Sequence, residues 1–232
     1  MAKSNKSYKD KLERGYELYN SIKNMLSFLP AEEDLEPGKY LTFLNSITNI
    51  NHSADSIKEK HGLSIKARQE LFLKDKGVKR RASYIFAYCK SRSDLKLQTE
   101  MIGRLSKSIL NYKKSDTPVK GKSVKHINRK EQSFGDYVSL FEDLIDEVRL
   151  IPSYTPPNEL IQISTLVSFR KEMLESNKTV DDKLNSYNTI NKKRLESYNM
   201  LHDRMVRIKS SVKSQYGINS SEYQSIKGIR VN

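Results

Sequence analysis

Residues 160–198 read LIQISTLVSFRKEMLESNKTVDDKLNSYNTINKKRLESY. A stripe of side chains recurs in this stretch every three or four positions without a skipped turn, at Leu160, Ile163, Val167, Arg170, Leu174, Asn177, Asp181, Leu184, Tyr187, Asn191, Arg194 and Tyr198. Because an α-helix repeats every 3.6 residues, the spacing predicts one amphipathic helix of about 40 residues, roughly 60 Å long. The stripe is partly polar, and we expect Arg170, Asn177 and Arg194 to fix the register of packing or to pair with carboxylates.

The first half of the chain carries a similar order of features, with a Leu-rich helix, a proline and a longer helical stretch. The matching residues are Leu18, Ile22 and Pro30 with Leu140, Leu144 and Pro152, 122 positions apart; Phe43, Asn51 and Arg68 with Phe169, Asn177 and Arg194, 126 apart; and Ile85 and Cys89 with Ile208 and Val212, 123 apart. Offsets that differ by three or four need only small changes in loop or helix length. Duplication of one helical unit therefore explains the pattern.

The predicted fold is all-α, with two related helical-bundle repeats built from long antiparallel helices and joined by a helix and a basic linker. We place repeat 1 at residues 1–92, the connecting helix and basic linker at 93–131, repeat 2 at 132–217 and a C-terminal tail at 218–232. Apolar residues make up 36% of the chain, which favours slender bundles over a thick globule. No proline lies between Gly38 and Thr117 or after Pro157, and this permits long helices.

The first half is predicted to begin with a helix from Tyr8 to Leu29. An acidic run follows between Pro30 and Pro37, and it consists of Glu32, Glu33, Asp34 and Glu36. We interpret this run as the start of the next helix rather than as a metal site, because negative charge is favourable at a helix N-terminus. The next helical stretch is expected to break near Gly62 and near Gly77.

Three further segments complete the prediction. Leu95 to Tyr112 has the spacing of an amphipathic helix, whereas Lys113 to Lys130 has seven basic residues against one acid and is expected to be a mobile linker. After Gly217, a serine cap near Glu222 indicates one short helix. The last residues either dock as an extended tail or fray.

The second half of the chain also resembles a known family. The residues that carry the resemblance are Gln132-Ser133-Phe134, the turn from Ile151 to Leu160, Val212-Lys213-Ser214 with Tyr216-Gly217, and Ser220 to Tyr223. They are similar to a family of uncharacterised, internally duplicated helical proteins of Bacteroidota. This chain departs from that family's pattern in having an extra proline in the turn, Tyr216 in place of phenylalanine, and Ser221-Glu222 where proline is usual. The resemblance implies a duplicated helical fold and brings no activity with it.

The sequence contains no motif of a common catalytic or metal site. It has no glycine-rich phosphate loop, no His-Glu-x-x-His, no Cys-x-x-Cys and no Gly-x-Ser-x-Gly. The four histidines, His52, His61, His126 and His202, are scattered, and Cys89 lies on an apolar stripe. The carboxylates Glu142, Asp143, Asp146 and Glu147 are interpreted as a solvated or paired face rather than a di-metal centre. We therefore predict no catalytic residue, no cofactor and no metal.

Charge gives the strongest functional indication. The 42 Lys and Arg residues against 28 Asp and Glu residues give a net charge of +14. This favours acidic partners, nucleic acid included, or else simply keeps the protein soluble. The candidate contacts are Lys74, Lys76, Lys79, Arg80 and Arg81 around Gly77, and Lys113, Lys114, Lys120, Lys122, Lys125, Arg129 and Lys130 in the linker. Tyr84 and Tyr88 either stack on bases or belong to the helix core.

Location and role are inferred from what the sequence lacks. A single cysteine excludes an internal disulfide, the first residues do not form a secretory signal, and no apolar run approaches the length of a membrane span. We expect a protein of the cytoplasm or of a particle assembled inside the cell. The predicted role is a non-enzymatic structural or protein-interaction module that self-associates or binds another protein. A component of a large assembly such as a virion is one form of that role. The alternatives are a nucleic-acid-associated protein and, less favoured, an enzyme.

Overall fold

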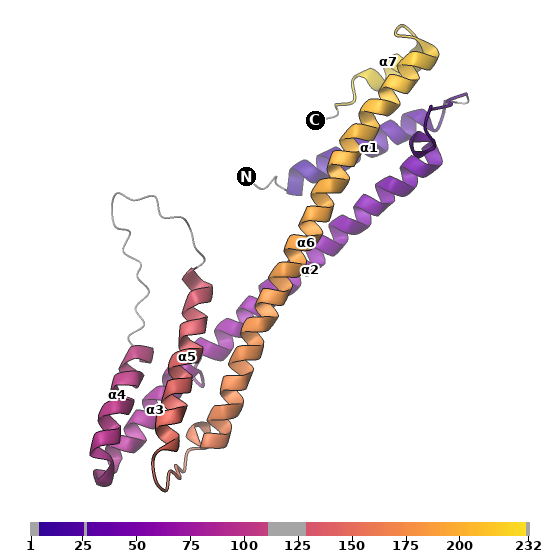
Figure 1. Cartoon of the computed structure of the whole chain (residues 1–232). Helices are drawn as coiled ribbons and strands as arrows, with labels where there is room; N and C mark the ends of the chain where they lie inside the picture. Colours follow the sequence, from indigo (N-terminus) through magenta and orange to yellow (C-terminus); the bar gives the residue numbers. More distant parts are fainter. Residues whose placement is uncertain (1–4, 26, 111–128, 231–232) are drawn as a thin grey trace, which may run out of the picture. The chain divides into compact units, whose positions relative to one another are not determined.

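The computed structural model describes residues 5–25, 27–110 and 129–230, and over these residues the chain is all-α (Figure 1). The α-helices are α1 (Asn5–Ile22), α2 (Pro37–Leu73), α3 (Val78–Ser91), α4 (Lys96–Leu110), α5 (Arg129–Arg149), α6 (Ile163–Tyr216) and α7 (Ser221–Lys227). Single 3-10 turns, η1 (Glu33–Leu35), η2 (Ser93–Leu95) and η3 (Glu159–Ile161), precede α2, α4 and α6. The prediction of an all-helical chain is confirmed.

The helices form two compact units. Unit 1 consists of Met1–Glu59 and Asn185–Asn232, and unit 2 consists of Lys60–Leu184. Both long helices, α2 and α6, contribute residues to both units. Each unit therefore contains residues from both predicted repeats, so the units do not follow the boundaries that we drew from the sequence.

Unit 1 is held together by α1, the first part of α2, the last part of α6, and α7. Its core contains Leu18, Leu44, Leu201 and Ile208, of which none is more than 1% exposed. α1 approaches its neighbours closely at Gly15, where a Cβ atom would lie 2.8 Å from Leu44 Cδ2. The face of α1 that carries Gly15 and Leu18 thus meets α2 and α6.

α1 ends at Ile22, earlier than the predicted Leu29. The side chain of Asn24 donates to the carbonyl of Asn20, a bond that competes with continuing the helix. Leu29 is 80% exposed, and its backbone N–H donates to Gln215 Oε1 at 3.0 Å. A side chain from α6 thus takes the hydrogen bond that a longer helix would have used.

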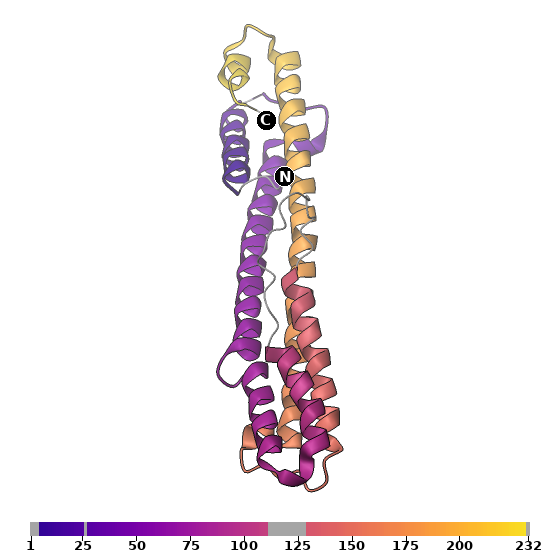
Figure 2. The ribbon, with the colours of Figure 1, turned by 90° about the vertical axis from the view of Figure 1, so that its left-hand side faces the viewer.

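Unit 2 contains α3, α4 and α5 side by side, together with the end of α2 and the start of α6 (Figures 1 and 2). Its core includes Phe72, Ile85, Ile102, Phe141 and Met173, all fully buried. α4 confirms the helix predicted from Leu95 to Tyr112. Most of the predicted linker, residues 111–128, lies outside the described residues, and α5 begins at Arg129.

One of the two predicted helix breaks is confirmed and the other is wrong. The chain turns between α2 and α3 at Gly77, where a Cβ atom would lie 2.4 Å from the carbonyl oxygen of Phe72. α2 instead continues through Gly62, where a Cβ atom would meet nothing within 4 Å. A glycine inside a helix costs only about 1 kcal/mol, which the packing of the surrounding turns offsets.

α6 is longer than predicted, with 54 residues against the expected 40 or so. It ends at Tyr216, and the next residue, Gly217, has a φ of 91°, in the left-handed region that favours glycine. α7 has the predicted serine cap, since Tyr223 N–H donates to Ser220 Oγ at 3.1 Å. Of the two alternatives for the last residues, docking is the one observed at Ile229, which is buried in the core of unit 1.

Candidate functional site

Four of the predicted basic contacts surround the turn between α2 and α3. Lys74, Lys76 and Arg80 are exposed, and Lys79 is half-buried. Lys74 pairs with Glu70 at 2.9 Å, and Arg80 lies 3.9 Å from Asp75. Exposed ion pairs of this kind contribute at most about 1 kcal/mol, so these cations remain able to exchange their partners for phosphates.

Arg81 does not belong with these exposed cations, and here the sequence-based assignment needs correction. Its side chain is 7% exposed, and its guanidinium donates to the backbone carbonyls of Lys76, at 2.9 Å, and of Leu160. It also lies over the ring of Phe169 at 4.0 Å. Burial lowers the pKa of Arg81, while the nearby Glu172 raises it. Arg81 therefore joins α3 to the start of α6 and has no free donor face for a phosphate.

The other predicted contacts lie in the basic linker. Lys113, Lys114, Lys120, Lys122 and Lys125 fall outside the described residues, and Arg129 and Lys130 occupy the first turn of α5. The two tyrosines differ from each other. Tyr84 is 36% exposed, 6.0 Å from the Arg80 guanidinium, whereas Tyr88 packs edge-on against Tyr154 at 5.2 Å. Only Tyr84 remains a candidate for stacking.

Two further buried arginines lie on aromatic rings. Arg68 of α2 is 3% exposed, with its guanidinium 4.3 Å from the ring centre of Phe134. Arg194 of α6 is 7% exposed and lies 4.8 Å from the ring centre of Tyr8. A desolvated cation over a ring contributes about 2 kcal/mol. Both side chains thus serve packing.

A charged network in unit 1 was not predicted from the sequence. Arg207 donates to Glu32 Oε2 and to Asp34 Oδ2, each at 2.7 Å, and Arg204 Nε lies 3.2 Å from Asp34 Oδ2. Arg204 also covers the ring of Phe43 at 4.0 Å. Residues Glu32 and Asp34 belong to the acidic run, which forms η1 ahead of α2 and pairs with α6. The spacing of Arg204 and Arg207, three apart on one helix face, was the available signal.

Two of the acidic positions of α5, Glu142 and Asp146, are used in ion pairs. Arg170 of α6 pairs with Glu142, and Arg149 pairs with Asp146 at 2.9 Å. Of the two roles expected for Arg170, pairing with a carboxylate is the one observed. Within the described ranges, no group of three or more His, Cys, Asp and Glu side chains is arranged to hold a metal ion.

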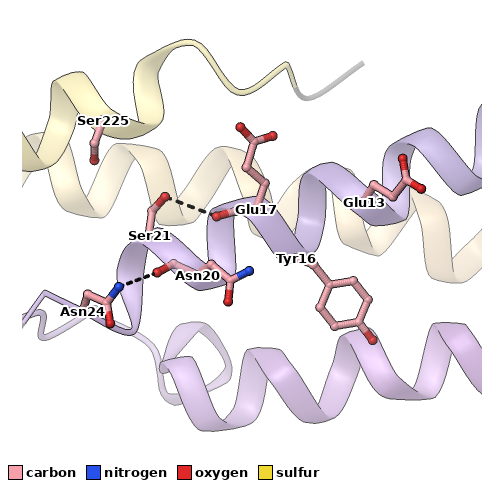
Figure 3. Close-up of a pocket in the computed structure, with 7 residues that line it drawn as sticks. All are labelled: Glu13, Tyr16, Glu17, Asn20, Ser21, Asn24 and Ser225. Carbon is pink, nitrogen blue, oxygen red and sulfur yellow. Dashed lines mark hydrogen bonds between the residues drawn. The ribbon is translucent and has the colours of Figure 1, made fainter.

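Figure 3 shows an open groove between α1 and α7 in unit 1. It is lined by Glu13, Tyr16, Glu17, Asn20, Ser21, Asn24 and Ser225. Ser21 and Asn24 donate to backbone carbonyls of their own helix, at 3.2 and 3.1 Å, and Tyr16 donates to Asn45 Oδ1 at 2.9 Å. These side chains are occupied in helix and interhelix bonds. The groove presents two carboxylates and no nucleophile beside a base.

The reactive side-chain types are buried or dispersed. Cys89 is fully buried, and burial raises the pKa of its thiol from the usual 9.0 to about 11, although Arg92 acts in the opposite direction. Burial also raises the pKa values of Tyr40 and Tyr154. His52 and His202 are exposed, His61 is half-buried, and His126 lies outside the described residues. A thiol with a raised pKa is a poor nucleophile at neutral pH.

None of the helices in the described part of the chain is both long and apolar enough to cross a membrane. Comparison with protein-family models, with curated proteins and with solved structures gives no match for this chain.

Proposed function

We propose that this protein is a non-enzymatic structural and protein-interaction module, built by duplication of one helical segment, that assembles with copies of itself. The observation that carries the proposal is that unusual contacts inside unit 1 recur inside unit 2 at a nearly constant spacing. We also propose that the chain is related to the duplicated helical proteins of Bacteroidota that its second half resembles.

The arginine contacts supply the first equivalence. Arg68 lies on Phe134 in unit 2, and Arg194 lies on Tyr8 in unit 1. Arg68 and Arg194 are 126 positions apart, and so are Tyr8 and Phe134. The aromatic neighbours match as well. Phe72 packs on Phe134 in unit 2, and Tyr198 packs on Tyr8 in unit 1. Phe72 and Tyr198 are also 126 positions apart.

A second equivalence involves another pair of arginines. Arg81 covers Phe169 in unit 2, and Arg204 covers Phe43 in unit 1, each at 4.0 Å. The arginines are 123 positions apart and the rings 126. These are the offsets at which the amino-acid sequence repeats. Two independent origins for four matched cation–ring contacts would require the same geometry to arise twice, so one copied segment is the simpler account.

Hydrogen bonds to turn residues give a third equivalence. Arg92 donates to the carbonyl of Ser153 at 3.0 Å, and Gln215 Nε2 donates to the carbonyl of Ser27. The donors are again 123 positions apart and the acceptors 126. In both units, a side chain from the end of a helical stretch holds the turn that follows a shorter helix.

These contacts favour a structural role because the buried arginines are already packed against aromatic rings. The charged groups buried in the described residues are Arg68, Arg81 and Arg194, and all three lie on aromatic rings. A catalytic site instead needs a nucleophile or an acid–base pair whose members converge on a pocket. The groove of Figure 3 lacks such a set.

Sedimentation equilibrium tests the proposed self-association. We expect the mean mass of the intact chain to rise above 26.9 kDa as the concentration increases from about 1 to 100 µM, because association follows mass action. A mass that stays at 26.9 kDa throughout would overturn the self-association.

A second candidate function, binding of phosphate backbones, is favoured by the exposed cations beside Gly77. Lys76 and Lys79 flank the first turn of α3, whose backbone N–H groups add partial positive charge. We expect a single-stranded oligonucleotide to bind at low salt, and the double variant Lys76→Ala/Lys79→Ala to lower the salt slope by about 1.4, since each phosphate contact on a single strand contributes about 0.7. The matched control is Lys171→Ala on exposed α6 surface. No binding by the unmodified chain at low salt would remove this candidate.

A further inference from the structure

We infer that the two halves of the chain, residues 5–110 and 129–230, are a mutually binding pair in which each half carries the surface that completes the other. The protein is then equivalent to a dimer of half-chains on one polypeptide. The symmetry of this pair rests on the proposed duplication, but the contacts that join the halves are observed directly.

Unit 1 takes its core equally from both halves. Among the described residues, the first half supplies Leu18, Ile22, Phe28, Leu35, Tyr40, Leu44 and Ile47, and the second supplies Tyr198, Leu201, Met205, Ile208, Val212, Ile226 and Ile229. Seven buried apolar side chains from each half face one another. Separation of the halves would expose both sets to water, which opposes dissociation because apolar surface is more stable when buried.

Unit 2 is shared in the same way. The end of α2, with α3 and α4, belongs to the first half, whereas α5 and the start of α6 belong to the second. Phe72 of the first half packs edge-on against Phe134 of the second at 4.8 Å between ring centres. Neither half therefore contains a complete core for either unit.

Directional polar contacts also join the halves and fix their register. In unit 1, Arg207 reaches Glu32 and Asp34, each at 2.7 Å. In unit 2, Arg92 reaches Ser153 at 3.0 Å. Charge-assisted hydrogen bonds of this kind depend strictly on geometry, so they select one alignment of the two halves.

A chain cut between the halves keeps every described helix whole, because α4 ends at Leu110 and α5 begins at Arg129. One half made alone would likewise keep its helices whole and would lack the other half's contribution to each core. Exchange of an identical element between two chains is a low-cost route to a dimer. The partner that either surface fits is the complementary half of this chain.

Cleavage of the full chain tests the inference. A protease recognition sequence replaces residues within 111–128, and the purified protein is then cut. We expect the two fragments to co-elute in equal amounts at the mass of the intact chain at about 1 µM. We also expect the midpoint of chemical unfolding to depend more steeply on concentration in the cut protein than in the intact chain, because reassembly of the two halves has become bimolecular. Separation of the fragments under native conditions would overturn the inference.

Two matched substitutions identify the contacts responsible. Arg68→Ala and Arg194→Ala are each expected to weaken the association of the cut fragments tenfold or more, while Lys193→Ala, an exposed neighbour on α6, leaves it unchanged. Circular dichroism of each uncut variant verifies that the helices form. An unchanged dissociation constant in both arginine variants would contradict the contacts proposed. Self-association is judged separately, from the mass of the uncut chain, so the two proposals fail independently.

Discussion

At the scale of single residues, burial decides what each arginine does. Arg80 and Arg81 are adjacent in the sequence, yet Arg80 is exposed beside Asp75 and Arg81 lies in the core of unit 2. The guanidinium of Arg81 satisfies two carbonyls and covers a ring, which offsets part of the cost of burying its charge. The basic cluster around Gly77 therefore contains exposed cations that face solvent and one buried arginine that packs in the core.

The substitution Arg81→Ala is expected to lower the free energy of unfolding by about 3 kcal/mol, because two buried carbonyls lose their donor and a void is left over Phe169. Arg81→Lys should give a smaller loss, since it keeps the charge but not the planar fork. Urea unfolding followed by circular dichroism measures both. Arg80→Ala is the control, with an expected change below about 0.5 kcal/mol. Equal effects at positions 80 and 81 would contradict this account.

The thiol of Cys89 predicts a dependence of stability on alkaline pH. Its pKa is about 11 in the folded protein against the usual 9.0, so above pH 9 the unfolded chain loses the proton first. The free energy of unfolding should then fall between pH 9 and 11, by at most about 3 kcal/mol from this group, and be unaffected by it below pH 8.

The matching variant is Cys89→Val, because valine is an apolar residue of similar size that cannot ionise. Its unfolding free energy, measured across the same pH range, should fall less steeply than that of the unmodified protein. Burial also raises the pKa values of Tyr40, Tyr154 and Tyr198, so these tyrosines contribute to the part that remains. An identical slope in both proteins would rule out the thiol as a contributor.

At the scale of elements, the length of the helix that packs on α1 or α5 is matched by how many apolar side chains α1 or α5 carries on the covered face. α4 has 15 residues and packs on α5, whereas α7 has seven and packs on α1. α5 buries Val138 and Ile145 as well as Phe141, Leu144 and Val148. α1 instead presents Glu13, Glu17 and Asn20 in the groove of Figure 3. A face that is not covered carries polar side chains, because apolar ones there would stay in water.

Two glycines on the same stretch of chain should respond in opposite directions to alanine. Gly77→Ala places a methyl group 2.4 Å from the Phe72 carbonyl oxygen, so the turn between α2 and α3 must shift, at a cost of about 1–3 kcal/mol. Gly62→Ala meets open space inside α2 and should stabilise the protein by up to about 1 kcal/mol through helix propensity. Thermal unfolding of the two variants is the measurement. A destabilising Gly62→Ala would show that this position is not an ordinary helix interior.

At the scale of the whole molecule, the net charge of +14 works against compactness. Like charges repel one another in the folded chain more than in the expanded unfolded chain, and salt screens that repulsion. The exposed ion pairs, such as Lys9 with Glu13, oppose this trend only weakly.

Raising the salt concentration from about 50 to 300 mM should therefore stabilise the protein by about 1 kcal/mol, or roughly 2–4 °C in Tm. Scanning calorimetry with sodium and then potassium chloride measures the change, and the two salts should agree because only screening is involved. A lower Tm at high salt would mean that ion pairs, rather than net repulsion, dominate the electrostatics.

The amino-acid sequence by itself determined the helical class, the turn at Gly77, the serine cap of α7 and the α4 helix, and it named pairing with a carboxylate as one of two roles for Arg170. Each of these depends on side-chain periodicity, on backbone geometry or on charge along one helix face, and such properties are local. Only the tertiary structure decided that each compact unit takes residues from both halves, that Arg81 is internal, and that α1 stops at Ile22. Those outcomes depend on which distant side chain reaches a given carbonyl or ring, as Gln215 reaches Leu29 and Arg81 reaches Phe169. Spacing along the chain does not contain that information, because an exposed arginine and a buried one occupy the same pattern until another helix covers one of them.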